Sequence, residues 1–221
     1  MGKGMLRDLQ SMLSRINGIE QNLDVYDFLV TDAALLAQLE TGETARSTAE
    51  KVLIQESPDA VDMTLYLDEE LLRRLTSRDP RRRLGRANLA DFWIALEGVS
   101  HFNYIAWNAA SDKSVTLMEV EMQAEVDKYV GARLLSEQQR TSLGDSVFRR
   151  LFDEPRFDEQ LGPAELSRYR HASRFAGRFC RSLEQRFASG ALAPAMLHEL
   201  RAFYRLPQPE KISHIQVASF A

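Results

Sequence analysis

Four polar side chains recur at helical spacing in a segment that is otherwise apolar. The chain has no lysine or arginine between Ala87 and Asp112, which predicts a central, buried helix. In order along this segment stand Glu97, His101, Tyr104 and Asn108. Spacings of four, three and four residues place these side chains along one strip of the helix. A buried carboxylate has a raised pKa unless a cation holds it ionised, so we expect Glu97 to have a cationic partner.

Two further carboxylates follow in the next segment. Glu121 and Glu125 are again four residues apart, and an antiparallel pair of helices would bring them toward Glu97 and His101. Three carboxylates and an imidazole between helices of a bundle can bind iron, manganese or zinc. The sequence therefore predicts a candidate divalent-metal site at Glu97, His101, Glu121 and Glu125, and Tyr104 and Asn108 join Glu97 and His101 as candidate catalytic residues.

A purely structural interpretation of the same residues stays open. Known carboxylate-bridged metal bundles place Glu and His three residues apart, whereas Glu97 and His101 are four apart. In the structural interpretation, Glu97 pairs with His101 or with an arginine, and Tyr104 and Asn108 bond to backbone. Glu121 and Glu125 would then lie on a solvated face beside Lys128.

Arginines form a second group of candidate binding residues, an anion or partner surface. In the segment after Pro163 one set lies almost opposite an apolar stripe, and a second set stands in a loop. The two sets are Arg170, Arg174, Arg178 and Arg181, and Arg81, Arg82 and Arg83. Together they suggest phosphate or nucleic-acid binding. The sequence pI of about 5.7 argues against a dedicated nucleic-acid binder, and a partner protein or a solvated face are the alternatives.

Other catalytic chemistry has little support in the sequence. The lone Cys180 falls within the apolar stripe, which is typical of a packed thiol. None of the 11 glycines forms a nucleophile elbow, a phosphate-binding loop or a dinucleotide fingerprint. The common cofactor folds are therefore not indicated.

Apolar periodicity predicts the elements that position these residues. A period of two over 51–56 and 61–67, around the turn Ser57-Pro58-Asp59-Ala60, indicates a β-hairpin. An isolated hairpin is marginal in water, so we expect it to pack on helices or to gain Val25 to Val30 as a third strand. Helices are predicted over about 5–16, 32–39, 69–75, 88–110, 116–135, 136–153, 163–188 and 194–204.

The predicted fold class is α-rich α+β. A small N-terminal helix and β-hairpin region, residues 1–86, packs on a C-terminal bundle of four to five helices, residues 87–221. With 44% hydrophobic residues the two regions are expected to form one compact unit. No apolar leader opens the chain and no segment is apolar enough to span a membrane, so we expect a cytoplasmic protein.

Charge is distributed in blocks along the chain. Residues 1–72 hold 5 basic and 14 acidic side chains, a net charge of −9, and residues 73–88 hold 7 arginines against one aspartate, a net of +6. Complementary charge contributes specificity to association. From sequence alone we favour a non-enzymatic protein that binds another protein or a second copy of itself. A metal- or small-molecule-binding enzyme at Glu97 and His101 is the alternative, and nucleic-acid binding is the second alternative.

Overall fold

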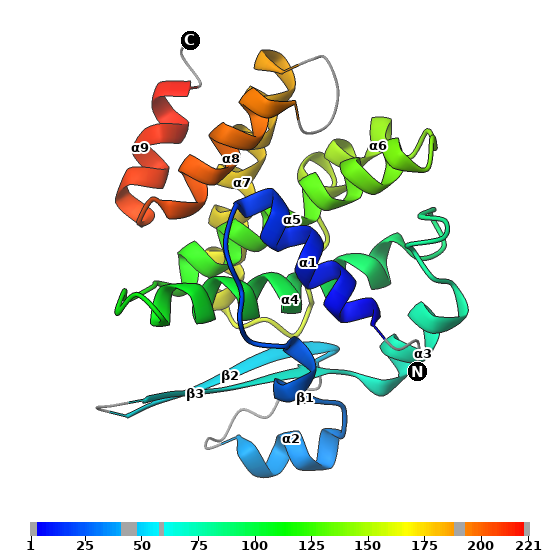
Figure 1. Cartoon of the computed structure of the whole chain (residues 1–221), viewed down its shortest axis with the longest axis vertical. Coiled ribbons are helices and arrows are strands. Elements are labelled where there is room, and N and C mark those ends of the chain that lie inside the picture. Colours follow the sequence, from blue (N-terminus) through cyan, green and yellow to red (C-terminus); the bar gives the residue numbers. More distant parts are fainter. Residues whose placement is uncertain (1–3, 41–47, 58–59, 188–192, 219–221) are drawn as a thin grey trace.

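The computed structural model describes residues 4–40, 48–57, 60–187 and 193–218. It shows the predicted α-rich α+β fold, with a small sheet packed beneath a group of helices (Figure 1). The α-helices are α1 Met5–Asn17, α2 Ala33–Leu39, α3 Glu69–Ser77, α4 Leu89–Ala109, α5 Leu117–Gln138, α6 Gly144–Phe148, α7 Pro163–Arg186, α8 Pro194–Arg205 and α9 Gln208–Ala218. No helix in these ranges is long and apolar enough to cross a membrane.

The sheet contains the predicted hairpin and a short third strand. Strands β2 (Glu50–Ser57) and β3 (Ala60–Leu67) are antiparallel, and β1 (Leu29–Val30) pairs with β3 in parallel. The predicted third strand is therefore confirmed in its last two residues, whereas Val25–Phe28 form a 3₁₀ turn, η1. The side chain of Asp24 accepts the Tyr26 N–H and so begins that turn. Pro58 and Asp59 of the predicted turn, and the predicted helix end at Thr41-Gly42, lie outside the described residues.

Helix α4 is the central element, as its apolar sequence predicts. It packs against α1, α3, α5 and both long strands, and it has buried residues around its whole circumference. At Gly98 a Cβ atom would lie 2.9 Å from Leu65 Cδ1 and 3.0 Å from Glu50 Cγ. Because Gly98 lacks that atom, the hairpin approaches α4 closely, and the first residue of β2 lies beside it.

Local capping signals account for several helix starts. Asp32 accepts N–H groups at the start of α2, Asp68 does so for α3, and Thr116 with Glu119 forms the expected capping box of α5. Asn88 occupies the N-cap position of α4, but its side chain accepts no N–H group of that helix. The Asn88 side chain accepts the Gly85 N–H and donates to the carbonyls of Arg78 and Arg83, so it holds the preceding loop instead.

The prediction of one helix over 136–153 is also wrong. Helix α5 continues through Gln138, and the chain then turns because the Ser136 hydroxyl accepts the Gly144 N–H and donates to the Thr141 carbonyl. Helix α6 follows and passes into a π-helical turn, η2 (Arg149–Asp153). Helix α9 was not predicted, since the last helix predicted from the sequence is 194–204; α9 begins directly after Pro207.

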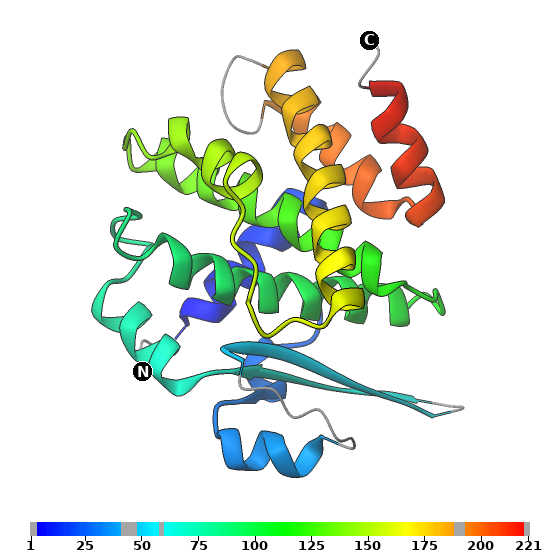
Figure 2. The ribbon, with the colours of Figure 1, turned by 180° about the vertical axis from the view of Figure 1, so that it is seen from behind.

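Residues 154–162 form an irregular connection between η2 and α7. Figure 2 shows this connection passing across α4 toward the sheet before α7 begins. Helix α7 then packs along α5. The connection, α4, α5, α7 and the start of β2 thus surround one region of the molecule.

Candidate metal centre and adjoining pocket

A cluster of six ionisable side chains lies between α4 and α5. Glu97 and His101 come from α4, and the remaining members come from α5 and from the first residue of β2. This acidic cluster consists of Glu50, Glu97, His101, Glu121, Glu125 and Lys128. Glu97 faces Lys128, and His101 faces Glu121. The partners on α5 thus follow in the opposite order to the residues on α4, as expected for two antiparallel helices. The structure therefore brings all four sequence-predicted metal-ligand candidates together.

His101 lies at the centre of this cluster and is only 6% exposed. Its Nδ1 atom is 3.2 Å from Glu50 Oε1, and its Nε2 atom is 3.5 Å from Glu121 Oε2. The Nε2 atom is buried and has no hydrogen-bond partner among the described residues. Burial acts to lower the pKa of His101, but Glu50 and Glu121 outweigh it and raise this pKa well above 6.5.

Lys128 lies between two of the carboxylates. Its Nζ atom is 2.9 Å from Glu97 Oε2 and 2.5 Å from Glu125 Oε1. Burial alone would raise the pKa of Glu97, but Lys128 and His101 outweigh that effect and lower it. Burial raises the pKa of Glu125, and the Oε2 atom of Glu125 has no hydrogen-bond partner among the described residues. Glu97 thus has a cationic partner, but this partner is Lys128, whereas the structural interpretation of the sequence named His101 or an arginine.

Negative charge is in excess in this cluster. Four carboxylates stand against one lysine and one histidine, and burial raises the pKa of Glu50 as well. Uncompensated charge in the protein interior is costly. The excess must therefore be balanced either by protons on the carboxylates and on His101 or by a bound cation.

The ligand atoms are close enough for one ion. One atom each from Glu97, His101 and Glu121 lie within 4.8 Å of one another. Ligands about 2.1 Å from a zinc ion can be at most about 4.2 Å apart, so small side-chain rotations suffice to close the site. The 3.5 Å separation of His101 Nε2 and Glu121 Oε2 already fits.

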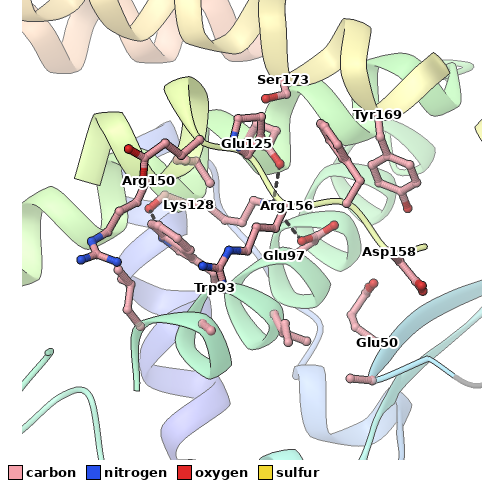
Figure 3. A pocket seen from close by; sticks show the side chains of 18 of the residues that line it. Glu50, Trp93, Glu97, Glu125, Lys128, Arg150, Arg156, Asp158, Tyr169 and Ser173 are labelled. Carbon is pink, nitrogen blue, oxygen red and sulfur yellow. Dashed lines mark hydrogen bonds and ion pairs between the residues drawn. The ribbon is translucent and has the colours of Figure 1, made fainter. Parts of the chain in front are cut away.

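A pocket of about 620 Å³ adjoins the acidic cluster. Glu50, Glu97, Glu125 and Lys128 line it, whereas His101 and Glu121 do not. Its other walls come from Trp93 on α4, Tyr169 and Ser173 on α7, and the connection 154–162. Figure 3 shows Glu97, Glu125 and Lys128 in the middle of this lining, with Tyr169 beside them. Burial and then the carboxylate of Glu121 raise the pKa of Tyr169. One of the three ligand candidates that lie close enough for one ion, Glu97, therefore forms part of the pocket wall, and it adjoins His101 and Glu121, which do not line the pocket.

Two of the predicted catalytic candidates lie elsewhere. Tyr104 donates to Glu119 Oε1 at 3.4 Å and packs edge-on against Tyr204, and the Asn108 side chain donates to the Tyr104 carbonyl. Neither residue lines the pocket, and the Tyr104 ring lies against Tyr204 of α8 instead. The alternative placement of Glu121 and Glu125 on a solvated face is also wrong, since Glu121 is only 7% exposed.

The arginine sets occupy separate parts of the surface. Arg170, Arg174, Arg178 and Arg181 are exposed on α7, as the sequence predicts, but Arg181 pairs with Glu184 and stacks on Phe148. In the loop, Arg81 pairs with Asp79 and Asp8, and Arg82 and Arg83 are exposed. Figure 2 shows the 78–88 loop and α7 on different sides of the molecule. The two sets therefore do not form one continuous basic surface.

Sequence reasoning missed several residues of the site. Glu50 was outside the predicted strand. It is two residues before Val52, so the two side chains lie on the same face of β2, and Val52 packs on the core. Tyr169 belongs to the apolar stripe of the segment after Pro163, and Trp93 lies in the apolar segment between Ala87 and Asp112, so the sequence marked neither residue as part of a pocket, although both line it. Arg150 and Arg156, which also line the pocket, lie in η2 and in the irregular connection, where no periodic pattern marks a direction.

Comparisons with known proteins give no relative for this chain. No family model, no curated protein and no solved structure matches it. The functional assignment must therefore come from the chemistry of the acidic cluster and the pocket.

Proposed function

We propose that this protein binds a divalent transition metal through Glu97, His101 and Glu121, and uses it on a small molecule held in the adjoining pocket. One imidazole and two carboxylates suit manganese, iron or zinc better than magnesium, which prefers oxygen ligands alone. This site replaces the contact surface that the sequence alone favours as the first candidate.

One observation carries this proposal. His101 is buried and its Nδ1 atom is engaged by Glu50, while its Nε2 atom lies near Glu121 and has no hydrogen-bond partner in the part of the chain that the structure describes. Metal-binding histidines commonly donate their second ring N–H to a carboxylate, which fixes the tautomer and turns the free nitrogen toward the ion. Glu50 is in the position of that carboxylate.

The rest of the acidic cluster supports chemistry at the pocket wall. A bound ion would balance part of the excess negative charge and would polarise an oxygen atom of a molecule in the pocket. Glu125 lines the pocket, and one of its carboxylate oxygens lacks a hydrogen-bond partner among the described residues, so it is placed to accept a proton. Lys128 holds Glu97 and Glu125 in position and contributes a fixed positive charge.

Metal analysis of protein purified without chelator, or loaded with zinc, manganese or iron(II) and desalted, tests the proposal. We expect about one ion per chain, with binding lost in His101→Ala and strongly weakened in Glu121→Gln. Glu121→Gln preserves the side-chain shape, and circular dichroism checks that each variant is folded. His171→Ala, an exposed histidine on α7, is the matched control and should bind like the parent. Absence of stoichiometric metal under all three loadings would overturn the proposal.

A second candidate function rests on α7. Arg170, Arg174 and Arg178 are exposed, and no ion pair joins them to a carboxylate in the described parts of the chain. We propose that this face binds an acidic surface of a second copy, for which the first third of the chain supplies the charge. Sedimentation at low and high salt tests it. Self-association that weakens with salt and is lost in the Arg174→Glu, Arg178→Glu double variant is expected, and a monomer at low salt would contradict it.

A further inference from the structure

The pocket beside the acidic cluster has a basic side as well as an acidic one. Arg86, Arg150 and Arg156 line it together with the carboxylates. In Figure 3, Arg150 and Arg156 extend toward Trp93, and Glu50 and Asp158 lie on the opposite side. A ligand that occupied the whole pocket would therefore meet positive charge at one end and the acidic cluster toward the other.

Arg150 and Arg156 differ from the arginines that the structure pairs with carboxylates. Arg7, Arg74 and Arg133 each form an ion pair, whereas no hydrogen bond or ion pair is formed by the guanidinium of Arg150 or Arg156 within the described ranges. The Nε atom of Arg150 is moreover buried. Both arginines line the pocket, so an anion bound there would give their guanidinium groups an acceptor.

The backbone around Arg150 also has an unusual conformation. Arg150 lies in the π-helical turn η2, and π-turns within helices are rare and often occur at functional sites. The adjoining Phe152 packs against Gly177 of α7, where an added Cβ would lie 3.1 Å from its ring. This close contact fixes η2 on α7 and with it the position from which Arg150 reaches the pocket.

Trp93 forms a flat wall on the same side. Its indole N–H donates to the Lys128 carbonyl at 3.2 Å, which fixes the ring. Leu89 and Ile94 continue the apolar surface along the pocket. The volume of about 620 Å³ is that of a site for a small molecule.

We propose that the pocket binds a small anionic molecule whose phosphate or carboxylate group is held by Arg150 and Arg156. Its flat apolar part lies against Trp93, and its other end reaches Glu97. Guanidinium groups bind both kinds of anion through paired N–H donors. This inference rests on the proposed function, because it names the class of molecule on which the metal site acts.

Fluorescence of Trp93 provides the test. The chain has two tryptophans, so Trp107→Phe leaves Trp93 as the only reporter. Metal-free Trp107→Phe protein is titrated with phenyl phosphate, benzoate and the neutral benzyl alcohol. We expect saturable changes with the two anions and not with the alcohol, and the stronger anion identifies the preferred group. Adding Arg150→Met and Arg156→Met should weaken anion binding by at least about tenfold. Adding Arg174→Met on α7 should leave it unchanged.

Three results would overturn the inference: no saturable change with any probe, equal affinity for alcohol and anions, or unchanged anion affinity in the double arginine variant. Because the titration uses metal-free protein, its outcome is separate from the metal analysis. Anion binding without metal binding would contradict the proposed function alone, and metal binding without anion binding would contradict this inference alone. His101→Ala should retain anion binding in either case.

Discussion

Two buried polar clusters lie on opposite sides of α5, and they differ in how their charges are balanced. The acidic cluster has four carboxylates against one lysine and one histidine. The second, which we call the amide cluster, has one carboxylate and one lysine. It consists of Asn17, Ser100, Gln123, Asp127 and Lys211.

Hydrogen bonding differs in the same way. Both carboxylate oxygens of Asp127 accept donors, from Gln123 at 3.0 Å and from Ser100 at 2.6 Å. Lys211 donates to the Gln123 side chain and to the carbonyls of Phe203 and Tyr204. No member of the amide cluster lines the pocket. Among the described residues, two buried atoms of the acidic cluster, His101 Nε2 and Glu125 Oε2, have no hydrogen-bond partner, whereas the amide cluster has one such atom, Asn17 Oδ1.

This contrast separates a structural network from a site. A cluster with equal numbers of carboxylates and lysines, in which both oxygens of Asp127 and the Lys211 Nζ atom form hydrogen bonds, serves to fix the packing of α1, α4, α5 and α9. A cluster with excess charge, a buried nitrogen without a partner and a neighbouring pocket is incomplete without a ligand. Helices α4 and α5 thus contribute to both clusters: to the amide cluster, which stabilises the fold, and to the acidic cluster, which is the candidate binding site.

Lys128→Met should have the largest effect on stability. It leaves Glu97 and Glu125 buried without their cation, and breaking a buried pair in this way costs about 3–5 kcal/mol. Urea unfolding of the metal-free protein measures the loss. The exposed Lys113→Met is the control and should change the free energy of unfolding by less than about 0.5 kcal/mol. A loss below about 1 kcal/mol for Lys128→Met would mean that the pair is not desolvated as the structure shows.

Asp127→Ala should separate the two clusters. It removes the acceptor of Asn17, Ser100 and Gln123, and we expect a loss of about 2–3 kcal/mol in the free energy of unfolding. Zinc affinity, measured by calorimetry on the folded variant, should not change, because Asp127 contacts none of the proposed metal ligands. A parallel loss of zinc affinity would show that the two clusters are energetically linked and would weaken the comparison.

Lys211 predicts a pH dependence that arises in the amide cluster. Burial lowers the pKa of Lys211 from 10.5 to about 7. Between these values the unfolded chain holds this proton and the folded chain does not, so the free energy of unfolding should rise with pH by about 1.4 kcal/mol per unit. Below about pH 7 both states are protonated and the effect is constant.

Comparison of the parent with Lys211→Met isolates this effect, because other groups titrate in both proteins. The difference in unfolding free energy between the two should grow in favour of the parent as the pH rises above 7. A difference that stays flat up to pH 10.5 would show that Lys211 remains protonated in the fold.

Glu125→Gln should have the smallest effect. The substitution removes an ion pair with Lys128, but it also removes the repulsion from Glu97 and Glu121 that helps to raise the pKa of Glu125. These contributions oppose each other, and we expect the metal-free protein to change by less than about 1 kcal/mol. A loss above about 2 kcal/mol in urea unfolding would indicate that charge in the acidic cluster is balanced without any added cation.

The contrast also shows what could be predicted from sequence. Four-residue spacing on two successive helices was enough to predict that Glu97, His101, Glu121 and Glu125 meet, because α4 and α5 are antiparallel and regular. The prediction from the same spacing that Tyr104 belongs to the site was not fulfilled. The strip of polar side chains continues along α4 to Tyr104, but the pocket does not extend that far. Which part of a strip faces a cavity depends on elements distant in sequence, here α8 and the connection 154–162.

Glu50 and Arg150 show a second limit. Glu50 reaches His101 only because Gly98 allows the hairpin to approach α4, a contact between segments that local pattern does not reveal. Arg150 lies in a π-turn, so the period of an α-helix does not predict on which side of the turn its side chain lies. The elements and the ligand candidates could therefore be predicted, whereas the pocket and its basic side could not.

Nitrogen NMR of the histidine side chains tests the central claim most directly, because it reports what each ring nitrogen of His101 binds. With His101→Ala used for assignment, we predict that one equivalent of zinc shifts the Nε2 resonance of His101 to a metal-bound position while Nδ1 keeps its proton toward Glu50. If both nitrogens of His101 carry protons at neutral pH and neither resonance responds to zinc, manganese or iron(II), the acidic cluster is a proton-balanced structural network and the account is wrong.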